Sequence, residues 1–312
     1  MSRIHEALKR AELERASAQT PGAGSVPADS QAVVVASNAG NAGTAAAKRE
    51  VTPTVAAVPE GHFRFDELQA RCQAHSSWSP DLNTDVFSDA QSGHGAEQFR
   101  TLRSRLYQLR GSQPLRTLLV TSSMAGEGKT FVTGNLVRSI VRQAERKVLV
   151  IDADLRCPRL HMVFGAPVQP GLSDYLRGSS DETSVIQRGG AGNLCFIPSG
   201  SKVSDPSELL SNGRFKTLLD RIGPAFDWVI IDSPPCLPVA DSGVIANWCD
   251  GVLLVVRAGF TPSAVIVKSR QELAGRNVVG VVLNAVADDA LPHGSYYGYG
   301  YGDQKDGAHA SR

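Results

Sequence analysis

The sequence lacks several features that would assign it to a common class. None of its hydrophobic runs, such as residues 252–256 and 228–231, approaches the roughly 20 residues that cross a bilayer. The first segment, MSRIHEALKRAELERA, has interleaved charges and none of the apolar stretch that is typical of a signal peptide. We therefore expect a cytoplasmic protein rather than a secreted or membrane-spanning one.

The chain also lacks an excess of charge and a cysteine framework. With 32 Lys and Arg against 31 Asp and Glu, the formal net charge is +1, so no global field attracts nucleic acid. Five cysteines are scattered, with no Cys-x-x-Cys pair, which argues against a zinc site or a disulfide framework. We expect no nucleic-acid partner, and binding must come from a local site.

Composition divides the chain into four parts. Residues 1–16 have an amphipathic pattern with Ile4, Leu8 and Ala11 on one side, which predicts either a docking helix or a frayed end, because so short a helix rarely holds in water without a partner surface. From Ser17 to Pro59 there is no Leu, Ile, Met, Phe, Tyr or Trp, and such a segment cannot build a core. We expect a flexible tether and a poorly defined lead-in over 17–92, a folded domain over 93–286, and a flexible Gly- and Tyr-rich tail over 287–312.

The middle of the chain alternates apolar strands with helical patterns. The expected strands are rich in Val, Ile and Leu and cover residues 118–121, 148–152, 194–197, 229–232, 251–256 and 278–283. Continuous apolar strands separated by helices are typical of a parallel sheet covered on both faces. The pattern predicts a doubly wound, mostly parallel α/β fold with its ligand at the carboxyl ends of the strands.

A glycine-containing loop joins the first of these strands to a helix in the segment SSMAGEGKT, residues 122–130. Glycine lets backbone N–H groups approach phosphate oxygens, and the helix N-terminus favours negative charge. Lys129 would then contact the β- and γ-phosphates, and the Thr130 hydroxyl would bind Mg²⁺. The strict P-loop pattern has glycine where this chain has Ser123. The alternative is a Gly-rich turn followed by a chance Lys-Thr. The expected nucleotide contacts are Ala125, Gly126, Glu127, Gly128, Lys129, Thr130 and Phe131.

Three acidic residues follow two other expected strands. Asp152 and Asp154 lie in VIDADLR, and Asp232 ends WVIID. Two residues apart in extended geometry, Asp152 and Asp154 would point to one face. Beside a P-loop, these carboxylates could hold Mg²⁺ through its waters and orient a nucleophile, although each alone could be a helix cap or turn former. Arg156 could reach a phosphate or be a solvated surface residue.

In the order and spacing of these motifs, the chain resembles the bacterial tyrosine kinases (BY-kinases) of polysaccharide export systems, over about residues 95–301. The resemblance implies a P-loop NTPase fold of the MinD/ParA-like branch and an ATP- and Mg²⁺-dependent protein-tyrosine kinase. It maps Lys129, Asp152, Asp154 and Asp232 onto catalytic positions and Thr130, Asp154 and Asp232 onto the metal. Asp152 would activate the tyrosine hydroxyl. Arg156 would join the nucleotide contacts, and Asn284 would lie against the adenine.

Two further segments carry the resemblance. A helix over 96–110 contains Glu97, Arg100 and Arg103 in Glu-x-x-Arg-x-x-Arg spacing, which in relatives assembles subunits into a ring. Such a ring would bring one subunit's tail into its neighbour's active site, with phosphoacceptors at Tyr296, Tyr297, Tyr299 and Tyr301. The resemblance also implies a membrane chain-length regulator (co-polymerase) with an activating cytoplasmic segment, recruitment to the inner membrane through that partner, a cognate tyrosine phosphatase, and regulation of polysaccharide polymerisation and export.

Two other functions fit part of the pattern. A MinD- or ParA-like switch ATPase shares the fold and motifs, but it carries a second lysine near the start of the P-loop, where this chain has Met124. A nucleotide-binding scaffold without kinase activity is the third reading, and a site with complete motifs argues against it. Labelling of the tail tyrosines by ATP distinguishes the kinase from both alternatives.

Overall fold

The structure is a computed structural model that describes residues 61–74, 78–88, 93–189 and 192–287. The helix expected at residues 1–16, most of the tether and the four tail tyrosines lie outside these described residues. Within the described ranges, no helix combines the length and the apolar character needed to cross a membrane.

The described residues contain one eight-stranded sheet with the order β1-β4-β5-β3-β6-β2-β7-β8. Every neighbouring pair is parallel except β4 and β5, which are antiparallel. All the expected strands are present, with ends shifted by at most one residue, and the short β1 and β4 are additional. The strands are β1 Gln73–Ala74, β2 Thr117–Ser122, β3 Val148–Asp152, β4 Gln187–Arg188, β5 Leu194–Ile197, β6 Trp228–Asp232, β7 Gly251–Arg257 and β8 Val278–Asn284.

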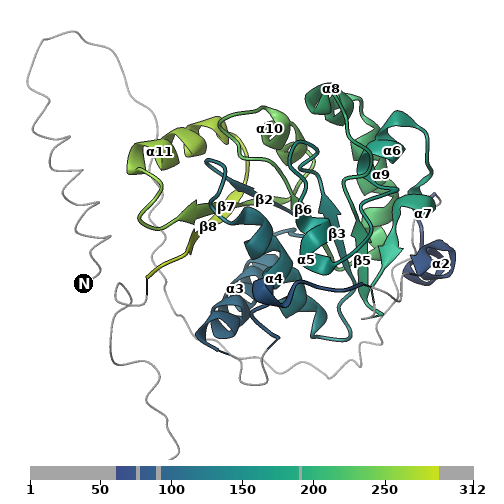
Figure 1. The fold of residues 1–312 in the computed structure, drawn as a ribbon, viewed down its shortest axis with the longest axis horizontal. Helices are drawn as coiled ribbons and strands as arrows, with labels where there is room; N and C mark the ends of the chain where they lie inside the picture. Colours follow the sequence, from purple (N-terminus) through teal and green to yellow (C-terminus); the bar gives the residue numbers. More distant parts are fainter. Residues whose placement is uncertain (1–60, 75–77, 89–92, 190–191, 288–312) are drawn as a thin grey trace, which may run out of the picture. The chain divides into compact units, whose positions relative to one another are not determined.

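Helices cover both faces of the sheet, which confirms the doubly wound fold (Figure 1). Apolar side chains of α3 His94–Ser112, α4 Lys129–Val141 and α5 Leu160–Phe164 pack on one face. The other face is covered by α2 Phe65–Arg71, α6 Leu172–Arg177, α7 Glu182–Val185, α8 Pro206–Ser211, α9 Arg214–Ile222, α10 Asp241–Ala246 and α11 Ser263–Glu272. Short 3-10 turns lie at Leu82–Thr84 and Gly223–Ala225.

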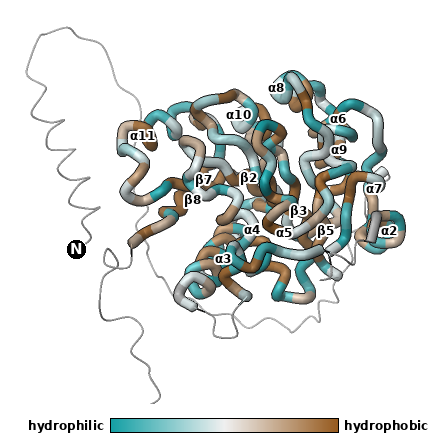
Figure 2. The backbone as a smooth tube through the Cα atoms, viewed as in Figure 1, coloured by the Kyte–Doolittle hydropathy of each residue, from teal (hydrophilic) through white to brown (hydrophobic). Residues whose placement is uncertain are grey.

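Hydropathy explains this layering. The central strands β2, β3 and β6 have buried side chains along almost their whole length, as expected for strands covered on both faces. Figure 2 shows hydrophobic colour along the strands of the sheet, whereas the colours of the surrounding helices change between hydrophobic and hydrophilic from residue to residue. Because β3, β6 and β2 are consecutive and parallel in the sheet, their carboxyl ends lie side by side.

Part of the segment expected as a lead-in packs against the domain, because the structure describes residues 61–74 and 78–88 there. Residues 78–88, named here the α4 strap, run along α4. The Trp78 ring packs 5.9 Å from the ring of Phe164 and 6.0 Å from that of Phe196. Asn135 of α4 accepts a hydrogen bond from Val86 N at 3.1 Å and donates one to Thr84 O at 2.8 Å. Phe87 is buried and Trp78 partly buried against the domain, although most residues between them are polar.

Candidate active site

The glycine bend lies at the end of the central strand β2 and leads into α4. Gly126 and Gly128 have φ angles of +84° and +90°, a region that side-chain-bearing L-residues rarely adopt. A Cβ added to Gly128 would lie 2.1 Å from Asn284 Nδ2. The backbone conformation therefore requires glycine at both positions, and at Gly128 the Asn284 side chain also leaves no room for a Cβ.

The side chain of Glu127 stabilises this bend from inside. It is 1% exposed, its Oε2 accepts a hydrogen bond from Met124 N at 2.6 Å, and Thr261 Oγ donates to its Oε1. Asn284, at the end of β8, donates from Nδ2 to the Glu127 carbonyl at 2.9 Å. Asn284 thus contacts the loop itself, and its expected contact with adenine stays a prediction.

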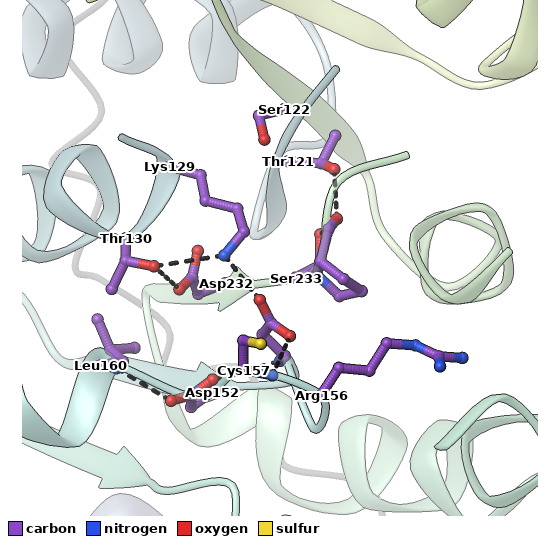
Figure 3. A network of polar contacts seen from close by, with 12 residues as sticks. Thr121, Ser122, Lys129, Thr130, Asp152, Arg156, Cys157, Leu160, Asp232 and Ser233 are labelled. Atoms are coloured by element: carbon purple, nitrogen blue, oxygen red, sulfur yellow. Dashed lines mark hydrogen bonds and ion pairs between the residues drawn. The ribbon is translucent and has the colours of Figure 1, made fainter. Parts of the chain in front are cut away.

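Lys129 and Thr130 face the acidic residues that end the neighbouring strands (Figure 3). The Lys129 ammonium lies 2.8 Å from Asp154 Oδ2. Thr130 Oγ1 donates to Asp232 Oδ2 at 2.7 Å, and Thr133 Oγ1 lies 3.2 Å from Asp232 Oδ1. The predicted motifs therefore meet in space, with the P-loop between two carboxylates.

Asp152 and Asp232 lie opposite each other where β3 pairs with β6. Both are fully buried, and burial raises the pKa of each carboxyl group, with the charge of Asp232 further raising the pKa of Asp152. Asp152 accepts hydrogen bonds from Leu160 N at 3.1 Å and Asp154 N at 3.2 Å. Asp154 lies just beyond the end of β3 and contacts Lys129. Burial lowers the pKa of the Lys129 ammonium, but the charges of these three carboxylates outweigh burial and raise that pKa above its ordinary value. That Asp152 and Asp154 point to one face stays a prediction.

These carboxylates do not form a ready-made cation site. Within the described residues, no group of three or more His, Cys, Asp or Glu side chains could hold a metal ion. The Thr130 hydroxyl and the Asp232 carboxylate supply two oxygen donors of the type that Mg²⁺ prefers. The donor set therefore fits an ion that takes its remaining ligands from phosphate and water.

A cavity of about 560 Å³ opens over the glycine bend. Asp154 lines it, while Asp152 and Asp232 are not among its lining residues. Part of its wall is apolar, formed by Pro234, Pro235, Pro238 and Val239, and its cationic side chains are Lys129, Arg156 and Arg159. The cavity has a size typical of small-molecule sites.

Arg156 lines this cavity, but its side chain extends away from Lys129 (Figure 3). Its Nε lies 2.8 Å from Asp241 Oδ2, and its Nη2 donates to Ser207 Oγ at 2.8 Å. A contact between Arg156 and a phosphate stays a prediction. The exposed Cys157 also lines the cavity, and its backbone N donates to Asp154 Oδ1 at 3.0 Å.

The residues expected to assemble a ring lie on α3. Glu97 and Arg100 form an ion pair of 2.8 Å within the helix. Arg103 instead donates to the Ser139 carbonyl of α4 at 2.5 Å, so it holds two helices of the same chain together. Their role in assembly stays a prediction.

Sequence reasoning missed Thr133, Asp241 and Thr261. Thr133 lies one helical turn after Lys129, so helical spacing could have found it. Asp241 and Thr261 act on motif residues that are 85 and 134 positions away. No local pattern indicates contacts of that range.

The glycine bend leaves room for phosphate, and a lysine ammonium and a hydroxyl lie beside a strand-end carboxylate. These groups lie at the carboxyl edge of a doubly wound sheet. Together they define the class of this protein, which is a nucleotide-binding P-loop NTPase. The family model for the AAA domain matches residues 115–261, which include the P-loop and all three acidic residues.

Comparison with known proteins identifies a family within this class of P-loop NTPases. Tyrosine-protein kinase Etk of Escherichia coli K12 is 36% identical over 210 residues, 67% of this chain and 29% of Etk. Tyrosine-protein kinase CpsD of Streptococcus agalactiae is 34% identical over 212 residues, 67% of this chain and 91% of CpsD. The solved kinase domain of E. coli Etk superposes with a TM-score of 0.63 at 34% identity, covering 73% of this chain and 87% of that domain.

The chain therefore belongs to the bacterial tyrosine-protein kinase family. It spans most of the length of CpsD but less than a third of that of Etk.

Proposed function

We propose that this chain is an ATP-dependent protein-tyrosine kinase that phosphorylates the tyrosine cluster of its own C-terminal tail in trans. The observation that carries this proposal is that Lys129, Thr130 and Asp154 line one cavity and that the Thr130 hydroxyl donates to the buried Asp232. Family membership supports tyrosine as the acceptor. The sequence supplies four acceptors, at positions 296, 297, 299 and 301.

In the proposed reaction the tyrosine oxygen attacks the γ-phosphorus, the bond to the β-phosphate oxygen breaks, and the tyrosine proton passes to a carboxylate. Lys129 neutralises charge on the transferred group, because its ammonium lies at the cavity beside the glycine bend. Thr130 and Asp232 would hold Mg²⁺, which when bound neutralises phosphate charge. The apolar wall at Pro235 and Pro238 offers a surface for an aromatic ring.

The proton acceptor is a carboxylate of the VIDADLR motif. Asp154 lines the cavity, whereas Asp152 is fully buried with a raised pKa. Asp152→Asn and Asp154→Asn should be compared by the pH profile of kcat. The variant that abolishes the acidic limb of the profile identifies the base, since that limb reports protonation of the catalytic carboxylate.

The main experiment is incubation of the full chain with Mg²⁺ and ATP, followed by mapping of phosphate by mass spectrometry. We expect label on the tail tyrosines and a loss of about a hundredfold or more in rate for Lys129→Met. Lys216→Met is the matched control, because Lys216 pairs with Asp220 at the exposed surface of α9. Phosphate release without modified tyrosine would instead support a switch ATPase.

Two complementary full-length variants test transfer in trans. Lys129→Met supplies intact tyrosines but no activity, and a variant with Phe at all four tail positions supplies activity but no acceptors. Phosphotyrosine on the Lys129→Met chain after mixing supports transfer between chains. If phosphotyrosine appears only when one chain carries both Lys129 and the tail tyrosines, transfer occurs within a chain.

We further propose that this kinase acts in the cytoplasm at the inner membrane, where it regulates polysaccharide polymerisation and export. Its proposed partners are a chain-length regulator with an activating cytoplasmic segment, further copies of itself in a ring, and a tyrosine phosphatase that reverses the modification. Family membership supports this assignment. The test is whether a peptide of the regulator's cytoplasmic segment raises the transfer rate, with a scrambled peptide as control.

A further inference from the structure

Asp241 is a buried carboxylate that the reaction as described does not use. It is the first residue of α10, and its side chain has no exposed surface. The contacts of its carboxylate in the described structure are Arg156 Nε at 2.8 Å, Arg156 Nη2 at 3.2 Å, and the Ser207 hydroxyl. A buried carboxylate is costly unless it is paired in this way.

The pair has the geometry of a fork. Two guanidinium nitrogens of Arg156 approach the two oxygens of Asp241, an arrangement that fixes the position and the plane of the arginine. Ser207 contacts both partners, which joins the N-terminal part of α8 to the cluster. Arg156 therefore has a defined place rather than the several rotamers of a solvated side chain.

This fixed arginine belongs to the loop that carries Asp154. Asp154 lies two residues before Arg156, contacts Lys129 at 2.8 Å, and accepts a hydrogen bond from Cys157 N. The loop is thus held at one end by the P-loop lysine and at the other by α10. Both Asp154 and Arg156 line the cavity, so a shift of the loop changes the groups that face the phosphates.

We propose that Asp241 is a positioning residue for phosphoryl transfer, which holds Arg156 at the cavity wall and thereby sets the place of Asp154. This role rests on the proposed function. Neutralising Asp241 frees the guanidinium and loosens the loop, while the P-loop backbone that binds the nucleotide stays intact. The effect therefore falls on kcat more than on the KM for ATP.

A double-mutant cycle in the full chain tests this inference, with Asp241→Asn, Arg156→Gln and the double variant. We expect each single change to lower kcat for tyrosine transfer about tenfold, and the kcat of the double variant to resemble that of either single one. In Asp241→Asn, which keeps Arg156, the KM for ATP should change less than about threefold. Ser207→Ala, which leaves the fork intact, should retain kcat within about twofold. Asp220→Asn in the exposed pair of α9 is the distant control.

Rates are measured at a temperature where circular dichroism shows every variant folded, so that a purely structural role leaves kcat unchanged. Wild-type kcat in Asp241→Asn, or a double variant whose loss is the product of the single losses, overturns the inference. If the wild-type chain releases phosphate without labelling tyrosine, the proposed function fails, and the same cycle on phosphate release still decides the role of Asp241. If the wild-type chain binds Mg-ATP but neither labels tyrosine nor releases phosphate, the proposed function and the role of Asp241 are both overturned.

Discussion

Replacing the two P-loop glycines one at a time separates the demands of backbone conformation from those of space. Gly126 and Gly128 have nearly the same φ angle, but a Cβ at Gly126 would meet nothing within 4 Å, whereas a Cβ at Gly128 would overlap Asn284. An L-residue in the left-handed region costs about 1 kcal/mol relative to glycine. We therefore expect Gly126→Ala to lower the free energy of unfolding by about 1 kcal/mol.

Gly128→Ala carries the same conformational cost and must also displace the Asn284 amide. That movement removes the 2.9 Å hydrogen bond to the Glu127 carbonyl, which contributes about 1 kcal/mol. We expect a total loss of about 2 kcal/mol, or a melting temperature lower by roughly 4–8 °C for a domain of this size. The measurement is urea unfolding of the protein without nucleotide, followed by circular dichroism.

The Asn284→Ala background is the control, because it removes the obstruction. There, Gly128→Ala should cost the same as Gly126→Ala, about 1 kcal/mol. Equal costs in the wild-type background would refute the reasoning, because they would mean that Asn284 does not brace the P-loop.

Three further predictions follow from burial and exposure. Because burial and Asp232 raise the pKa of Asp152, the contribution of Asp152 to stability is fully present below the ordinary aspartate pKa of about 4 and is lost as pH rises towards the folded value. Melting temperatures measured from about pH 4 upwards should therefore fall less steeply in Asp152→Asn than in the wild type, and an unchanged slope would contradict this prediction. Cys157 is exposed at the cavity, whereas burial raises the pKa of Cys72 to about 11 and that of Cys195 to about 12. Iodoacetamide should therefore modify Cys157 first, and bound Mg-ATP should slow that modification. Peptide mass spectrometry measures both. Deleting residues 1–60 should leave the melting temperature unchanged. Trp78→Ala should lower the free energy of unfolding by about 2 to 3 kcal/mol, because the Trp78 ring packs on Phe164 and Phe196. Equal melting temperatures for Trp78→Ala and wild type would show that this contact of the α4 strap adds no stability.

Local patterns were enough to predict the sheet and the motifs. Strands such as 148–152 and 194–197 are continuous apolar runs, so their burial can be read from composition alone. Lys129, Thr130 and the strand-end acids follow short spacings that reflect how a chain turns at the edge of a sheet. The parallel topology explains why Lys129, Thr130 and Asp154 line one cavity and why Thr130 reaches Asp232.

What sequence reasoning missed depends on contacts between distant segments. The two-residue strands β1 and β4 are too short to produce a period. The α4 strap resembles a loop because Trp78 and Phe87 are separated by polar residues, and its anchors, Asn135 and Arg138, belong to a helix some fifty positions later. The fork between Arg156 and Asp241 joins residues 85 positions apart, and no spacing rule indicates it.

An arriving nucleotide competes with Asp154 for the Lys129 ammonium. The 2.8 Å contact between them is almost excluded from water, so bringing phosphate to the lysine means loosening an existing attraction. Net affinity for ATP is then lower than for a loop whose lysine has no resident counter-ion. Under the proposed function, the same attraction favours release of ADP, because the Lys129–Asp154 ion pair forms again when the nucleotide leaves.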